Sequence, residues 1–247
     1  MSGDQVEFGF VAALEREVKG LVRDWDVRKV GAPLGPRTIY RTGKAALICA
    51  GTGSRRAEVA ARLLVEQCSP KVLISIGFAG ACAAGLAAGS IVVPAAVEAF
   101  AGGETGRSFR CAFGRGKLVT LDRVAGKGLK QCAAARFGAE AVDMEAAGVG
   151  AVAAEFGVEF VAIKAISDGA EDDLGFLAEF VRPEGFATGR FLAHIALRPG
   201  LWPEVRSLQR NSGLAAEALA RAVAGFIADR DGFAARYAEA GLTKESY

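Results

Sequence analysis

The sequence predicts an α/β fold in which short buried strands alternate with helices. Two observations support this prediction. Runs of apolar and β-branched residues recur at strand length, for example at 72–76 and 160–166, as in sheets that are buried on both faces. An Ala-rich segment of helix-favouring residues, 144–156, lies between two such runs. The turns that follow the strands are acidic or rich in glycine, and ligands of open α/β sheets bind at that edge.

The composition fits a compact enzyme or binding protein. The chain has 247 residues, with 51% hydrophobic and 23% charged residues, and we expect residues 1–247 to form a single domain. A net charge of +2 gives no reason to expect a nucleic-acid partner or a membrane surface. No apolar run is long enough to span a membrane, and the first residues lack a signal-peptide pattern.

The cysteine and histidine content limits the chemistry further. Five scattered cysteines without a CxxC spacing are typical of reduced thiols in a cytoplasmic protein, which is the localisation we expect. The only histidine is His194, so neither a histidine metal site nor a mechanism based on histidine is expected. We therefore predict no metal and no cofactor.

In the N-terminal half, the patterns predict strands joined by short helices. A first strand at 6–12 leads into a helix at 13–22 with acids in its first turn. Two strands flank Thr42-Gly43 as a hairpin, and a glycine-rich link leads from the second into a helix. The strand at 91–93 ends at Pro94. The expected strands are 6–12, 37–41, 44–50, 72–76 and 91–93, and the expected helices are 13–22 and 55–67.

The C-terminal half begins with a segment of different character. Residues 101–116 are rich in glycine and arginine, which predicts a mobile loop. Gly157 ends the helix at 144–156. The helix at 214–227 carries one apolar stripe, so we expect the C-terminal helices between 176 and 236 to pack on the body. The expected strands are 117–121, 139–142 and 160–166, and the expected helices are 128–137, 144–156, 176–181, 186–197 and 214–227.

Acids next to the ends of the predicted strands are the candidate site residues. Glu145 and Asp168 follow successive strands, where side chains of neighbouring strands converge on a ligand. Each alone is equally well explained as a first-turn helix acid or a turn former. Glu15 and Glu17 are two residues apart and cannot share one helix face, so one of them is expected to look toward the sheet edge.

A second candidate site is the glycine-rich link at 50–54. Its glycines allow a ligand to approach the backbone, and the helix that follows offers free N–H groups. Arg55 and Arg56 stand at the start of that helix, where cations oppose the helix dipole and a bound anion would offset the cost. Gly53, Arg55 and Arg56 are therefore a possible phosphate site, although solvated surface arginines are the simpler interpretation. The spacing matches neither a dinucleotide fingerprint nor a Walker motif.

Taken in order, the motifs resemble the nucleoside phosphorylase and nucleosidase superfamily, and most of all the methylthioadenosine/S-adenosylhomocysteine nucleosidases. The resemblance covers roughly residues 6 to 173. Each motif is weak alone, but their order is specific. The matching segments are AALEREV at 12–18, AGTG at 50–53, GFAG at 77–80, AGSIVV at 88–93, VDME at 142–145 and KAISD at 164–168.

This resemblance implies a three-layer α/β/α sandwich around a central mixed sheet, assembled as a homodimer or larger oligomer. It also implies cleavage of the N-glycosidic bond of a purine nucleoside. Asp168 would protonate the purine at N7, and burial or a neighbouring acid should keep its proton near neutral pH. Glu145 would hold the ribose hydroxyls with Met144 against the sugar, and Glu17 would polarise the attacking water. The other substrate contacts implied are Gly77, Phe78, Val124, Asp143 and Ser167.

Several positions depart from the family pattern. Phe78 stands where nucleosidases often have serine, Lys164 replaces an arginine, and Asp143 replaces a glutamate. A lysine is a point charge and does not reproduce the planar fork of arginine. Asp-Met-Glu and the segment 189–200 also resemble the hopanoid-associated phosphorylase branch, and an apolar Phe78 would suit a greasy 5′ substituent.

Three functions stay open on the sequence alone. Acids at 15 and 17 occupy the place where phosphorylases of this superfamily bind phosphate, which favours water as the nucleophile. Arg55 and Arg56 keep a phosphate-dependent phosphorylase open. The third possibility is a protein that binds a nucleoside without cleaving it.

Overall fold

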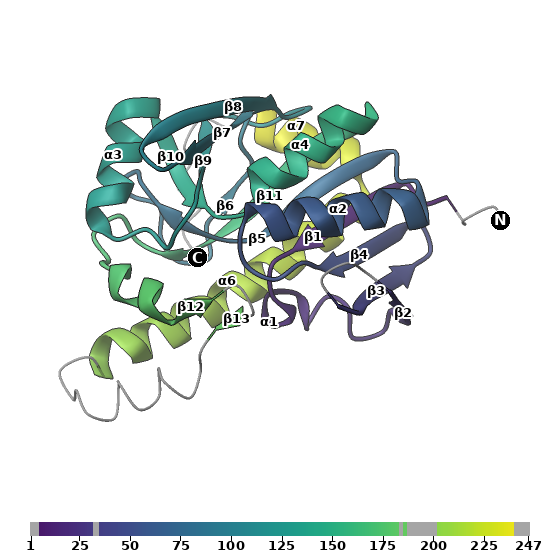
Figure 1. The fold of residues 1–247 in the computed structure, drawn as a ribbon, viewed down its shortest axis with the longest axis horizontal. Helices are drawn as coiled ribbons and strands as arrows, with labels where there is room; N and C mark the ends of the chain where they lie inside the picture. Colours follow the sequence, from purple (N-terminus) through teal and green to yellow (C-terminus); the bar gives the residue numbers. More distant parts are fainter. Residues whose placement is uncertain (1–4, 32–34, 183–184, 187–201, 240–247) are drawn as a thin grey trace.

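The computed structural model describes residues 5–31, 35–182, 185–186 and 202–239, and Figure 1 shows their arrangement. Eleven of the described strands form one mixed sheet. These strands are β1 (Phe8–Ala12), β2 (Asp26–Val30), β3 (Arg37–Thr42), β4 (Ala45–Cys49), β5 (Val72–Ala81), β6 (Ile91–Val92), β7 (Ala96–Ala101), β8 (Glu104–Arg110), β9 (Lys117–Leu121), β10 (Ala139–Asp143) and β11 (Glu159–Asp168). Two short strands, β12 (Val181–Arg182) and β13 (Gly185–Phe186), pair only with each other.

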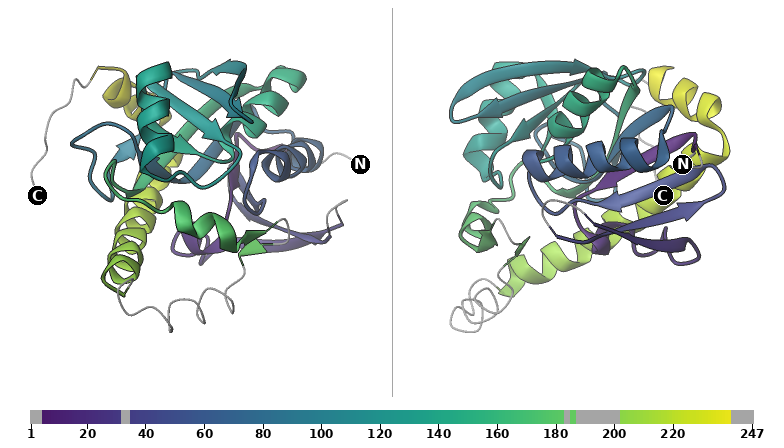
Figure 2. Two further views of the ribbon diagram at one scale, coloured as in Figure 1. Left: turned by 60° about the vertical axis from the view of Figure 1, so that its left-hand side comes forward. Right: turned by 45° about the vertical axis from the view of Figure 1, so that its right-hand side comes forward.

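Helices cover both faces of the sheet, which confirms the predicted three-layer sandwich (Figures 1 and 2). The helices α2 and α4 share one apolar core with the sheet. The helix α6 packs on the opposite face, where the predicted stripe residues Leu219, Val223 and Phe226 are completely buried. The helical elements are α1 (Glu15–Val18), α2 (Ser54–Cys68), α3 (Lys127–Phe137), α4 (Ala146–Phe156), the 3₁₀ helix η1 (Gly175–Phe180), α6 (Trp202–Ala228) and α7 (Arg230–Glu239).

Strand β5 organises the sheet around the candidate site. It runs parallel to β11 along almost its whole length. Its first part also runs parallel to β1, and its last residues pair antiparallel with β10. The apolar runs of β5 and β11 are buried almost throughout, as expected for strands inside a three-layer fold. The segments that follow β1 and β10 and the end of β11 therefore lie near one another around the second half of β5.

The segment GFAG at 77–80 was predicted to be a turn after a strand ending at Ile76, and this prediction is wrong. These residues continue β5 to Ala81. Gly77 has φ of +142°, a backbone conformation that side chains with a Cβ rarely adopt, so the strand bends there without ending.

Three further local predictions are corrected by the structure. Residues 101–110 are not a loop, because β7 and β8 form an antiparallel hairpin that turns at Gly102-Gly103, whereas residues 111–116 lie in no helix or strand. Strand β2 was not predicted, since its residues Asp26–Val30 are mostly exposed and form no buried apolar run. The first helix ends at Val18 instead of Val22. The predicted helix 186–197 lies almost entirely outside the described residues.

The two helices on one face approach each other closely at Gly148 of α4. A Cβ added there would lie 2.1 Å from the backbone oxygen of Ser54, the first residue of α2. Only a glycine fits this contact, because backbone cannot move aside as a side chain can.

Gly148→Ala should therefore lower the free energy of unfolding by about 1–3 kcal/mol, the usual cost of overpacking. Gly225→Ala is the matched control, since Gly225 is exposed on α6 and a Cβ there meets nothing within 4 Å. It should raise stability by about 0.5–1 kcal/mol. Urea denaturation of both variants measures the contrast, and equal stabilities would contradict the close-contact interpretation.

Candidate active site

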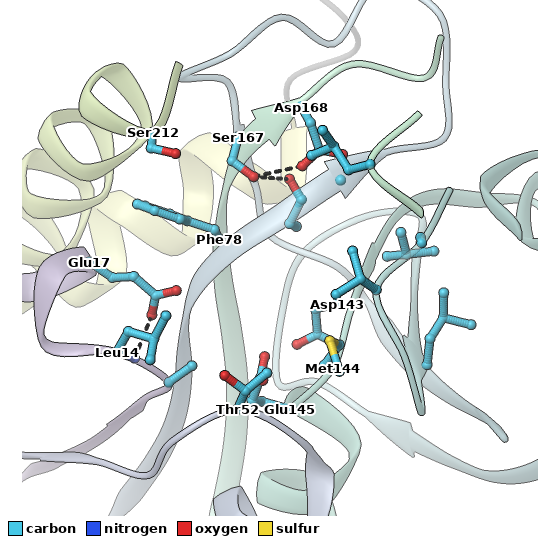
Figure 3. Close-up of a pocket in the computed structure, with 18 of the residues that line it drawn as sticks. Leu14, Glu17, Thr52, Phe78, Asp143, Met144, Glu145, Ser167, Asp168 and Ser212 are labelled. Carbon is cyan, nitrogen blue, oxygen red and sulfur yellow. Dashed lines mark hydrogen bonds between the residues drawn. The ribbon is translucent and has the colours of Figure 1, made fainter. Parts of the chain in front are cut away.

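A cavity of about 530 Å³ lies over the second half of β5 (Figure 3). The three acids predicted from the sequence, Glu17, Glu145 and Asp168, all line it, although they are far apart in the chain. Each is at least 92% buried. The predicted residues Phe78, Val124, Asp143, Met144 and Ser167 line the same cavity.

Glu17 reaches the cavity from the short helix α1. Its Oε2 accepts a hydrogen bond of 3.1 Å from the backbone N–H of Leu14, which holds the carboxyl group over the sheet. Gly77 lies directly beneath it, because a Cβ at Gly77 would come within 3.0 Å of the same oxygen. Burial raises the pKa of Glu17 above its ordinary value, more than its hydrogen bonds and nearby cations lower it. Gly77 itself does not line the cavity and acts here as space for Glu17.

Glu145 was predicted to lie within the helix, but it occupies the N-cap position of α4, and its side chain makes no hydrogen bond to the helix. Its Oε1 accepts a hydrogen bond of 2.8 Å from the backbone N–H of Gly53. This N–H is one of the donors predicted to bind an anion. Burial, followed by repulsion from Asp143, raises the pKa of Glu145 to about 8. The group therefore keeps its proton more readily than an exposed glutamate.

The two departures from the family pattern, Asp143 and Lys164, form one buried ion pair. Lys164 Nζ lies 2.8 Å from Asp143 Oδ2, and both side chains are at most 1% exposed. Lys164 also donates to Ser75 Oγ at 2.9 Å. Asp143 Oδ1 accepts a 2.6 Å hydrogen bond from Thr120 Oγ1, and Oδ2 accepts one of 2.8 Å from the N–H of Ala146. Asp143 thus anchors the start of α4 and, with it, Glu145.

Asp168 is the last residue of β11. Ser167 Oγ donates a 2.7 Å hydrogen bond to its Oδ1. Its Oδ2 lies 2.5 Å from Nζ of Lys130, a lysine of α3 that is 1% exposed. Asp168 is buried, as expected, and it has a cationic partner that the sequence did not predict. Lys130 lies in none of the segments that match the family, so the sequence analysis did not identify it.

The possible phosphate residues take other positions. Arg55 and Arg56 do not line the cavity. A Cβ at Gly51 would lie 3.1 Å from Nη1 of Arg56, so this guanidinium covers the backbone of the glycine link. Two other arginines, Arg16 and Arg123, line the cavity, and Arg123 is paired with Asp122 at 2.9 Å.

Helix α6 closes the far side of the cavity with Leu208 and Ser212, which sequence reasoning missed. A second chamber of about 300 Å³ shares Ser167, Asp168 and Leu208 with the first. It continues between the turn at 172–174 and the polar side chains Ser207 and Asn211 of α6. The site is therefore larger than the part bounded by the three acids.

Within the described part of the chain, no cluster of His, Cys, Asp or Glu could hold a metal ion. No helix in the same ranges is both long and apolar enough to cross a membrane.

Comparison with known proteins agrees with this geometry. A sequence model of the phosphorylase superfamily matches residues 7–134 and 113–187. The chain belongs to the phosphorylase superfamily. It is therefore an enzyme that acts on N-glycosidic bonds, either a nucleosidase or a nucleoside phosphorylase.

Solved structures of nucleosidases share the fold. A 5′-methylthioadenosine/S-adenosylhomocysteine nucleosidase from Neisseria meningitidis matches 90% of this chain and 98% of its own at 19% identity, with a TM-score of 0.68. The corresponding Helicobacter pylori enzyme matches 91% and 99% at 15% identity with the same TM-score. Futalosine hydrolase of Helicobacter pylori matches 90% and 97% at 14% identity, also with a TM-score of 0.68. The segment 189–200, which resembles the hopanoid-associated branch, lies outside the described residues.

The raised pKa of Glu145 predicts how stability depends on pH. Between about 4.5 and 8 the folded protein holds a proton on Glu145 that the unfolded chain has lost, so the free energy of unfolding falls as pH rises. Glu17 contributes in the same direction. Glu145→Gln should flatten this fall.

Urea denaturation at pH 5, 6, 7 and 8 measures the effect in the wild type and in Glu145→Gln. Glu66→Gln is the control, because Glu66 is exposed on α2 and its replacement should leave the slope unchanged. Parallel stability curves for wild type and Glu145→Gln would contradict the assignment.

Proposed function

We propose that the protein hydrolyses the N-glycosidic bond of an adenine nucleoside that carries a 5′ substituent, such as methylthioadenosine or S-adenosylhomocysteine. The observation that carries this proposal is the meeting of Glu17, Glu145 and Asp168 around one cavity of about 530 Å³. That volume is within the usual range for a site that holds a small molecule.

In the proposed reaction, the bond between purine N9 and ribose C1′ breaks and its electron pair goes to the purine. Asp168 delivers a proton to N7, so the base leaves without a negative charge. The ribosyl group becomes cationic at C1′. Glu145 stabilises that charge in its carboxylate form, which hydrogen bonds donated by the ribose hydroxyls favour over the protonated form. A water molecule attacks C1′ and gives its proton to the Glu17 carboxylate. The products are free adenine and the substituted ribose.

Two features of the site support water over phosphate as the nucleophile. The N–H of Gly53 already donates to Glu145, and Arg55 and Arg56 lie outside the cavity lining. The exposed Arg16, beside Glu17 on the cavity wall, is the feature that favours phosphorolysis as the second candidate.

The second chamber supports a substrate longer than adenosine. Its walls include Asp172, Asp173, Ser207 and Asn211, which suit a polar extension such as the amino-acid part of S-adenosylhomocysteine better than a lipid chain. An adenosine that carries a lipid, the kind of substrate implied by the hopanoid-associated branch, is therefore our less favoured substrate.

The deciding assay incubates the enzyme with methylthioadenosine, S-adenosylhomocysteine, adenosine and inosine, with and without phosphate. We expect adenine release at the same rate in both conditions and a higher kcat/KM for the 5′-substituted nucleosides than for adenosine. Strict dependence on phosphate, with a sugar 1-phosphate as product, would make the protein a phosphorylase. Tight binding without turnover would make it a nucleoside-binding protein.

Removal of either proton-transferring acid should abolish most of the activity. Asp168→Asn and Glu17→Gln should each lower kcat by about 10²–10⁴-fold, the usual contribution of a positioned acid or base. Glu66→Gln is the control and should keep wild-type kcat. Full activity of either site variant would remove that residue from the mechanism.

Two expectations about the whole protein also remain proposals. A reducing cytoplasm suits a chain whose five cysteines are all free thiols. A homodimer or larger assembly follows from the family resemblance, and light scattering on the purified protein tests it.

A further inference from the structure

Lys130 is a buried cation that the proposed reaction has not yet used. It lies on α3 and is 1% exposed. Its Nζ has three acceptors: Asp168 Oδ2 at 2.5 Å, the carbonyl oxygen of Gly169 at 2.7 Å and that of Asp172 at 2.9 Å. Three acceptors match the three N–H bonds of an ammonium group, and burying such a charge is tolerated only when it is paired in this way.

The backbone of β5 makes room for this contact. Gly80 pairs in register with Asp168 across β5 and β11. A Cβ at Gly80 would lie 2.8 Å from Asp168 Oδ2 and 3.0 Å from Lys130 Cε. The lysine chain and the carboxyl group thus meet over the α-carbon of a glycine, and any larger residue would separate them.

Charged groups around the pair lie on the exposed side. Asp172 and Asp173 lie in the exposed turn after β11, and Glu171 in the same turn pairs with Lys127 of α3 at 2.7 Å. The carbonyl oxygens of Gly169 and Asp172 that hold Lys130 thus belong to a turn whose residues 171–173 are exposed.

We propose that Lys130 is a positioning residue that supplies, through Asp168, the proton taken by the departing purine. This inference rests on the proposed function. The Lys130 ammonium transfers one proton to the Asp168 carboxylate, and the resulting carboxylic acid transfers it to N7 as the bond from N9 to C1′ breaks. Lys130 is left as a neutral amine and regains its proton from solvent. Each step moves one proton and needs no other reactant.

This role explains how an acid paired with a cation can still act as a proton donor. The pair as a whole holds a transferable proton, because Lys130 Nζ lies 2.5 Å from Oδ2 of the acid. The carbonyl oxygens of Gly169 and Asp172 accept hydrogen bonds from the ammonium group and hold it beside Asp168.

A purely structural role of Lys130 would give a different experimental result. If Lys130 only fixed the turn at 169–172, its loss would disturb the site equally for every substrate. If it supplies the proton, its loss should matter only for a leaving group that needs protonation. A 5′-methylthio-riboside of 4-nitrophenol provides the comparison, because nitrophenolate leaves without a proton.

The experiment measures kcat and KM of wild type, Lys130→Met and Lys130→Arg on methylthioadenosine and on the nitrophenyl riboside. Both variants should lose about 10²-fold or more in kcat on methylthioadenosine, with KM changed less than about threefold. Both should keep nitrophenyl riboside cleavage within about fivefold of wild type. Lys130→Arg is included because a guanidinium keeps the cation beside Asp168 but does not give up its proton. Lys71→Met is the matched control and should behave as wild type, because Lys71 is exposed and lines neither chamber.

Four results would overturn the inference. Equal losses on both substrates would reduce Lys130 to a structural anchor, and near wild-type kcat of Lys130→Met on methylthioadenosine would remove it from the reaction. Wild-type activity of Lys130→Arg would show that only the positive charge matters. A wild type that releases no base from any nucleoside would overturn the proposed function itself, and the inference with it.

Discussion

Two buried ion pairs determine the character of this site. Lys164 is paired with Asp143, and Lys130 is paired with Asp168, with both lysines at most 1% exposed. An unpaired charge at these depths would cost several kcal/mol, so each pair constrains where its acid can stand. Glu17 and Glu145 have no such direct partner, and burial raises the pKa of both. The same cavity therefore contains two acids paired with cations and two acids whose proton affinity is raised by burial.

Glycines of β5 make this arrangement possible. Gly77 leaves space for the Glu17 carboxyl group, and Gly80 leaves space for the meeting of Lys130 and Asp168. Both belong to the segment GFAG, whose glycines the sequence placed in a turn. In the structure they remain in the strand, so the motif serves to admit side chains over the sheet instead of reversing the chain. Phe78 between them forms part of the cavity wall.

The sequence located the three acids because strand ends can be read from apolar runs, and Glu17, Glu145 and Asp168 follow such runs. Strands β2 and β8 were not predicted, because exposed edge strands lack such an apolar run. Lys130 was not identified as a site residue, because a lysine in a short helix is usually an ordinary surface residue. Its partner is 38 residues away, and only the pairing of β10 with β9 and β5 brings α3 to the site. Leu208 and Ser212 were missed since the predicted helix began at Leu214.

The most direct test of the account is a crystal structure with a non-cleavable analogue of methylthioadenosine bound. The account predicts Asp168 within hydrogen-bond distance of the purine N7, Glu145 at the ribose hydroxyls, and Glu17 facing C1′ from the side opposite the base. An analogue bound outside this cavity, or with its purine turned away from Asp168, would contradict it.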